Sequence, residues 1–239
     1  MLQQIKQQLD RLRALGADYA DARWVPVEEN NYLLMWNGNL KDAFLSRESG
    51  IGVRVLYKGA WGFSAASDLS DLPALFGNAL DNARAASQRV TFPVRLADKE
   101  AVQAEFASPC GINPFQVPFA EKVAFMKEMD ERLDQAGVFQ RIAELTFVRK
   151  RIVFVDSEGS EIEKLITDVF AQLQVLGRDD QGETHERKFA PGRDGPLSRG
   201  WESIDRQPFA ENADRRVKEL NQIRVADQCP TDERTGSVL

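Results

Sequence analysis

The chain has 239 residues, of which 43% are hydrophobic and 28% are charged, and its formal net charge is −6. These values are typical of a globular chain that can bury one large core or two modest ones. The acidic balance argues against a stand-alone nucleic-acid-binding protein, which needs clustered positive charge to neutralise phosphates, and no apolar run approaches the ~18 to 20 residues of a membrane-spanning helix.

The first residues predict an amphipathic helix. Gly16 follows the last apolar position, where a glycine commonly ends a helix. The apolar residues that recur at helical spacing, with polar residues between them, are Leu2, Ile5, Leu9, Leu12 and Leu15.

The period then changes to that of strands. Asn37-Gly38 is the strongest hairpin signal in the chain, because both residues tolerate a positive φ. We expect an antiparallel meander. Its strands are predicted at 19–27, 31–36, 40–47, 51–57 and 60–65, with turns at 28–30, 37–39, 49–50 and 58–59.

A second helix is predicted up to Ser87. Ser70 is the expected N-cap, with Asp71 in the first turn and one apolar stripe from Leu72 to Ala83. Residues 89–118 contain four prolines and are expected to form an irregular connection.

The second half repeats the order of helix, strands and helix. Helices are predicted over 119–133, where Gly137 stops the first one, and over 209–224. The run 161–176 alternates in character: Leu165, Thr167, Val169, Ala171, Leu173 and Val175 lie on one face and Asp168, Gln172 and Gln174 on the other, as in a half-buried strand. The other expected strands are 142–150, 151–156 and 183–189, with turns at 157–159 and 177–180 and a Gly/Pro/Arg loop at 191–200.

These elements predict an α+β fold, in which antiparallel or mixed sheets carry long amphipathic helices packed on one face. We expect two sub-domains. The first covers residues 1–92, an irregular connection covers 93–118, and the second covers 119–239.

The single histidine, His185, excludes every metal site that needs two or more histidines. His185-Glu186 begins like a metalloprotease helix but lacks the second histidine, so we interpret His185 as a surface residue, with a proton-transfer or substrate role as the alternative. Cys110 is expected to be a passive thiol, and neither it nor Cys229 lies in a CxxC motif. Together with a first segment too polar for a signal peptide, this favours a cytoplasmic location.

The glycines of the strand region are interpreted as structural. The run that starts at Gly50 resembles a dinucleotide-binding fingerprint but fails it, because Val55 stands at the sixth position and no helix follows. We expect Gly50, Gly52, Gly59 and Gly62 to shape tight turns or close backbone approaches. The acidic group Asp156, Glu158, Glu161 and Glu163 is interpreted as a solvated turn, with a cation site as the alternative.

Four aromatic residues, Trp24, Trp36, Trp61 and Phe63, lie in the strand-rich first third. Aromatic side chains on strands usually pack a core. The alternative is that some of them line a groove that receives an extended peptide along a sheet edge, and we take Trp36, Trp61 and Phe63 as candidates for it.

The order of several short motifs resembles the TldD/PmbA family, whose members are described as candidate modulators of DNA gyrase. The resemblance covers nearly the whole chain, although no single motif is specific. It rests on Tyr19-Ala-Asp-Ala-Arg23, Trp36-Asn-Gly-Asn-Leu40, Gly50-Ile-Gly-Val-Arg-Val55, Gly59-Ala-Trp-Gly-Phe63-Ser64, the 69–88 helix, Asp156-Ser-Glu-Gly159 and Ala226-Asp-Gln-Cys-Pro230.

The resemblance implies a metallopeptidase whose zinc is held by an HExxxH motif and a further ligand in a C-terminal domain. The 239 residues contain no such motif, so none of the family's catalytic residues maps onto this chain and no metal or cofactor is expected within it. Because 235–239 resembles the start of a strand just ahead of that motif, we expect a piece of a protein about twice as long.

The expected role is to dimerise, with itself or with a paralogous family member, and to wall a chamber in which unfolded peptide substrates meet the zinc. No direct contact with nucleic acid or a membrane is expected. The alternative is a PmbA-like or regulatory binding module that has no peptidase activity.

Overall fold

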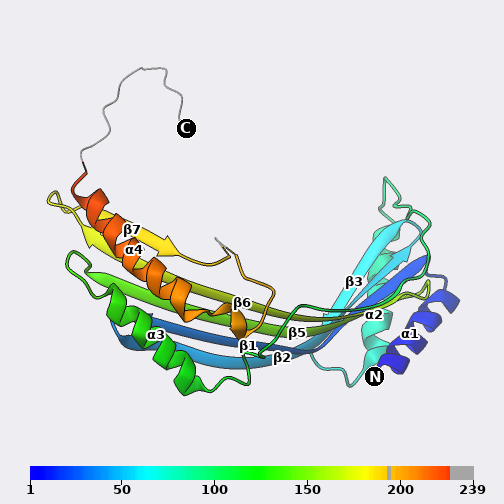
Figure 1. Cartoon of the computed structure of the whole chain (residues 1–239). Coiled ribbons are helices and arrows are strands. Elements are labelled where there is room, and N and C mark those ends of the chain that lie inside the picture. Colours follow the sequence, from blue (N-terminus) through cyan, green and yellow to red (C-terminus); the bar gives the residue numbers. More distant parts are fainter. Residues whose placement is uncertain (193–194, 227–239) are drawn as a thin grey trace.

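A computed structural model describes residues 1–192 and 195–226 (Figure 1). Part of the Ala226-to-Pro230 motif, Cys229 and the strand expected at 235–239 lie outside these residues. None of the helices that the structure describes is both long and apolar enough to cross a membrane.

Seven strands form one sheet. They are β1 (Tyr19–Trp36), β2 (Asn39–Tyr57), β3 (Ala60–Ala66), β4 (Gln103–Ala107), β5 (Gln140–Asp156), β6 (Glu161–Arg178) and β7 (Thr184–Phe189). The order across the sheet is β3-β2-β1-β5-β6-β4, and β7 also pairs with β6. All neighbours are antiparallel except β4 and β6, which are parallel.

Four α-helices accompany the sheet: α1 (Leu2–Ala14), α2 (Leu72–Ser87), α3 (Phe119–Leu133) and α4 (Arg206–Arg224), with a short 3₁₀ turn η1 (Trp201–Ser203) ahead of α4. Helices α1 and α2 lie at one end of the long curved sheet and α3 and α4 at the other (Figure 1). The α+β prediction is confirmed.

Two hydrophobic cores lie under these helix pairs. In β5, Phe147 belongs to the core of α3 and α4, whereas Val155 belongs to the core of α1 and α2. The residues between them include no bulge against β6, so both side chains point to the same face of the strand. The prediction that the helices pack on one face is therefore confirmed. The opposite face, here called the open face, carries mostly half-buried and exposed side chains, with buried ones such as Asp21 near the α1–α2 end.

Several predicted breaks are wrong because the strands are longer than expected. Residues 28–30 do not turn: Glu28 pairs with Glu48 on one side and Lys150 on the other, inside β1. Residues 49–50 likewise continue β2, and 142–156 belongs to the single strand β5. Polar residues do not interrupt these strands because one face of the sheet is exposed.

Other local predictions hold. The turns at 37–38 and 58–59 have positive φ at both residues, and α1 and α3 match their predicted ranges closely. The N-cap of α2 is Asp71 rather than Ser70, since the Asp71 carboxylate accepts a hydrogen bond from the Ala74 N–H at 2.9 Å. The connection expected to be irregular contains β4.

Candidate functional site

A hollow of about 410 Å³ indents the open face where β1, β2 and β3 run side by side. Its floor is made by Gly50 and Gly52, two β2 residues with no side chain to fill the space. Ten residues line it: Asp21, Arg23, Val25, Glu28, Glu48, Ser49, Gly50, Gly52, Arg54 and Phe63. We call this cavity the glycine hollow.

One end of the glycine hollow is closed by an ion pair. Arg54 donates from Nη2 to Asp21 Oδ2 at 2.7 Å and from Nε to both carboxylate oxygens at 3.1 Å. The Asp21 residue is only 3% exposed, and the guanidinium also stacks over Trp61 at 5.3 Å from the ring centroid. The hydrogen bonds that Arg54 donates to the Asp21 carboxylate raise the pKa of Arg54, so the guanidinium stays charged at this end.

Beyond this end, Tyr19 packs edge-on against Trp61, with ring centroids 6.0 Å apart. Burial, followed by the charges of Asp21 and Asp156, raises the pKa of Tyr19, so its hydroxyl stays protonated. The segment after α2 covers this region, because Lys99 crosses to the open face and donates to Asp156 at 2.5 Å.

The aromatic candidates do not share one groove. Phe63 lines the glycine hollow and is 58% exposed, and Trp61 lies two residues before it on β3. Trp36 is 42% exposed and lies at the opposite end of β1. At a rise of about 3.3 Å per residue, the strand places Trp36 on the order of 25 Å from Glu28, the nearest β1 residue that lines the hollow.

The four glycines singled out from the sequence have different surroundings. Gly59 lies in the β2–β3 turn with φ +76°, whereas Gly50 and Gly52 lie inside β2. Gly62 lies inside β3 where α2 approaches closely: a Cβ there would be 2.2 Å from the Ala79 oxygen and the Ala83 nitrogen. Sequence reasoning did not find the hollow, because its charged lining comes from two strands whose register only pairing reveals.

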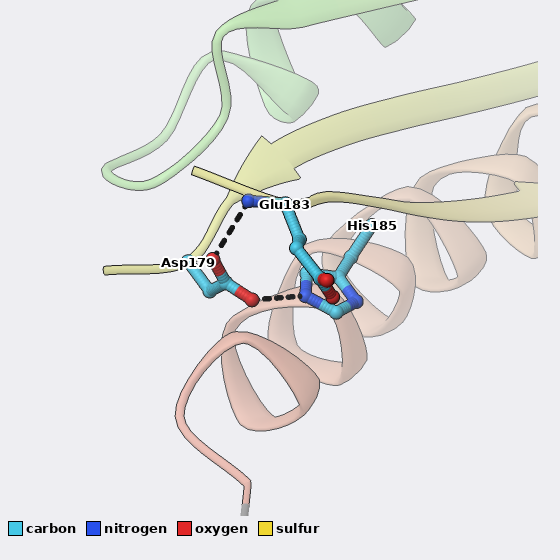
Figure 2. Close-up of side chains that lie close together, drawn as sticks. All are labelled: Asp179, Glu183 and His185. Carbon is cyan, nitrogen blue, oxygen red and sulfur yellow. Dashed lines mark hydrogen bonds and ion pairs between the residues drawn. The ribbon is translucent and has the colours of Figure 1, made fainter. Parts of the chain in front are cut away.

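A second cluster lies on the β6–β7 hairpin, where Asp179, Glu183 and His185 point toward one another (Figure 2). The Asp179 carboxylate is hydrogen-bonded to His185 Nε2 at 2.8 Å and accepts a hydrogen bond from the Glu183 N–H at 2.9 Å. The bond to His185 is the main reason that the pKa of Asp179 is lowered.

One imidazole and two carboxylates on a hairpin do not match the two-histidine helix that the family resemblance implies, so no metal chemistry is derived from this cluster. Cys110 is exposed and free. The four members of the acidic group at 156–163 all have cationic partners: Asp156 and Glu158 pair with Lys99, Glu161 with Lys6 and Glu163 with Arg151.

Comparison with known proteins gives two family matches. Residues 27–87 match the PmbA/TldA metallopeptidase domain 1, and residues 112–221 match the PmbA/TldA metallopeptidase central domain.

Two metalloproteases from archaea are similar in sequence. The one from Methanocaldococcus jannaschii is 24% identical over 73% of this chain and 39% of its own length. The one from Methanothermobacter thermautotrophicus is 27% identical over 81% of this chain and 40% of its own length. The chain therefore spans about two fifths of the length of these relatives.

Solved structures share the fold. A candidate modulator of a DNA gyrase from Thermotoga maritima superposes with a TM-score of 0.70 at 16% identity, over 96% of this chain and 50% of that one. TldE from Thermococcus kodakarensis superposes with a TM-score of 0.59 at 12% identity, over 91% of this chain and 47% of that one. Because the two family matches together cover most of the sequence, the chain belongs to the PmbA/TldD family of metallopeptidases.

Proposed function

We propose that this chain is the non-catalytic N-terminal part of a TldD/PmbA-type zinc metallopeptidase, and that its open face walls a chamber for unfolded peptide substrates. The observation that carries the proposal is the glycine hollow on a sheet face that no helix among residues 1–192 and 195–226 covers. A cavity with exposed aromatic and charged walls suits an extended peptide better than a buried cofactor.

The catalytic zinc belongs, in this proposal, to the C-terminal domain of the full-length protein and not to these 239 residues. The chain has one histidine, His185, and its side chain is hydrogen-bonded to Asp179. The two metalloproteases that resemble the chain are more than twice as long as the matched region, which leaves room for a separate metal domain.

The end of the sheet that carries the β1–β2 hairpin is proposed to contact a partner subunit, either a second copy or a paralogous family member. Leu40, Phe44 and Leu45 are exposed on β2 there, and Leu45 is 70% exposed. Because β3 pairs only with residues 51–57 of β2, this part of β2 is a free sheet edge among the described residues, and an exposed edge that carries apolar side chains is a ready site for pairing with another chain. A cytoplasmic location fits the free thiol of Cys110.

The test has two arms. We expect the coding sequence downstream of Leu239 to contain HExxxH and the full-length protein to cleave unfolded casein in a chelator-sensitive way. We expect the 239-residue chain alone, and its His185→Ala variant, to show no turnover. Metal-dependent cleavage by the chain alone, or absence of the motif downstream, contradicts the proposal; absence of the motif favours a binding module without peptidase activity.

A further inference from the structure

Two carboxylates face each other at the end of the glycine hollow that lies away from the Asp21–Arg54 ion pair. Glu28 on β1 is the direct cross-strand partner of Glu48 on β2, and both line the cavity. Like charges directly opposite each other on adjacent strands destabilise a sheet. The fold therefore keeps an unfavourable pair at this position.

A β-bulge brings this pair together. Asp21, Arg23 and Val25 alternate onto the open face, and simple alternation would next place Val27 there. The register shift between Val25 and Glu28 adds one residue to β1, so Glu28 takes that place instead. Bulges frequently redirect a side chain next to a functional site.

The charges of the hollow do not cancel. Asp21 and Arg54 neutralise each other, which leaves Arg23 against the two glutamates. Within the described ranges, no ion pair reaches the carboxylate of Glu28 or Glu48, although Lys150 is the neighbour of Glu28 on β5. The lining as a whole holds three carboxylates and two guanidinium groups, so it carries a net negative charge, and the two carboxylates without an ion pair among the described residues are those of Glu28 and Glu48.

The part of the hollow beside these carboxylates combines glycine backbone with apolar side chains, and Arg23, the cross-strand partner of Gly52, also lines it. Gly50 and Gly52 leave a side-chain-free track along β2, with Val25 on one wall. On the other wall, the Phe63 ring lies 3.2 Å from where a Cβ on Gly52 would be. Such a track suits the aliphatic stem of a lysine or arginine, whose charged head extends beyond its apolar part.

We propose that the glycine hollow binds a lysine or arginine side chain of an extended peptide, with the stem over Gly50 and Gly52 and the charged head between Glu28 and Glu48. This proposal rests on the proposed function, because it names the side chain that a peptide on the open face presents. Charge complementarity selects this occupant, since a cation relieves the repulsion between the two carboxylates.

The test compares two fluorescent peptides of otherwise identical Gly/Ser sequence, one with a central lysine and one with norleucine, which keeps the apolar stem and lacks the ammonium group. Anisotropy titration of the 239-residue chain is expected to show three- to tenfold tighter binding of the lysine peptide, as about 0.3 to 0.7 kcal/mol from each of two solvent-accessible ion pairs implies. High salt is expected to reduce the difference.

Glu28→Gln/Glu48→Gln is expected to remove the preference for lysine while leaving norleucine binding unchanged. Glu29→Gln is the matched control, because it removes the same charge from the next residue of β1, which points to the other face. Equal binding of the two peptides by the unaltered chain overturns the inference and leaves peptide binding intact. If neither peptide binds, both this inference and the proposed function are contradicted.

Discussion

The ammonium group of Lys122 lies 2.6 Å from the side-chain oxygen of Asn31, in the core between α3 and the sheet. Lys122 is 4% exposed, and its Nζ also lies 4.6 Å from the centroid of the Phe147 ring. Within the described ranges no carboxylate pairs with it. Burial lowers the pKa of Lys122 to about 8.

This burial predicts that stability rises in mildly alkaline solution. Between pH 8 and 10 the unfolded chain holds a proton on Lys122 that the folded chain has released, so the free energy of unfolding increases with pH, by up to about 3 kcal/mol over the full window. Urea unfolding at several pH values up to 10 measures this increase in the free energy of unfolding. The range stops there because the pKa of Tyr19 is raised, which reverses the trend at higher pH.

Lys122→Met is expected to abolish this rise, because methionine keeps the length of the side chain and removes the titrating group. Parallel stability curves for the two proteins between pH 8 and 10 would falsify the assignment.

The Asp21–Arg54 pair predicts strong coupling between two positions. Arg54→Met leaves the buried Asp21 carboxylate without its cation and is expected to cost on the order of 2 kcal/mol of unfolding free energy. Adding Asp21→Asn is expected to restore part of that loss, since the amide carries no charge. Denaturant unfolding of the two single variants and the double variant gives the coupling energy, and simple additivity contradicts the prediction.

The close approach of α2 to Gly62 predicts that a side chain at this position destabilises the protein. Gly62→Ala places a methyl group 2.2 Å from the Ala79 oxygen and is expected to cost about 2 kcal/mol or more, because helix backbone must move. Gly77→Ala, on the helix that Gly62 faces, is the control, since no neighbouring atom lies within 4 Å of its Cβ position. It is expected to stabilise the protein by about 0.5 to 1 kcal/mol. Thermal unfolding should shift in opposite directions; equal shifts contradict the close approach.

The hydrogen bonds that the Glu202 carboxylate accepts predict that the protein loses stability in acid. This carboxylate accepts N–H groups from Gly111 at 3.0 Å, Ile112 at 2.8 Å and Gly200 at 3.0 Å. Burial raises its pKa, but these backbone donors outweigh burial and lower the pKa to about 2. Because this value is below the ordinary 4.5, the contribution of Glu202 to stability is complete above pH 4.5 and is lost as pH falls toward 2.

Glu202→Gln is therefore expected to be less stable than the unaltered chain at neutral pH, with the gap narrowing between pH 4.5 and 2. Urea midpoints across that range measure the gap. Glu131→Gln, at an exposed position of α3, is the control and is expected to change little. A gap that stays constant with pH shows that the loss does not come from the charge.

Local patterns predicted the individual elements well where the chemistry of neighbouring residues decides the structure. Asn37-Gly38 and Lys58-Gly59 form the turns because these residues adopt positive φ readily, and β6 alternates as its sequence predicts. The breaks predicted at 28–30 and 49–50 are wrong, because polar residues do not by themselves end a strand. On a sheet with one open face, polar residues such as Glu28 remain in the strand.

Residue identity and spacing along the chain were enough to predict the α+β class and the family resemblance, and to exclude a two-histidine metal site within these 239 residues. Long-range strand pairing, in contrast, joins both halves in one sheet through β1 and β5 and turns Glu28 toward Glu48 at a bulge. It also separated Trp36 from Phe63 and turned two strand glycines into the floor of a cavity. Register and facing are set by pairing between distant segments, which local residue patterns do not encode.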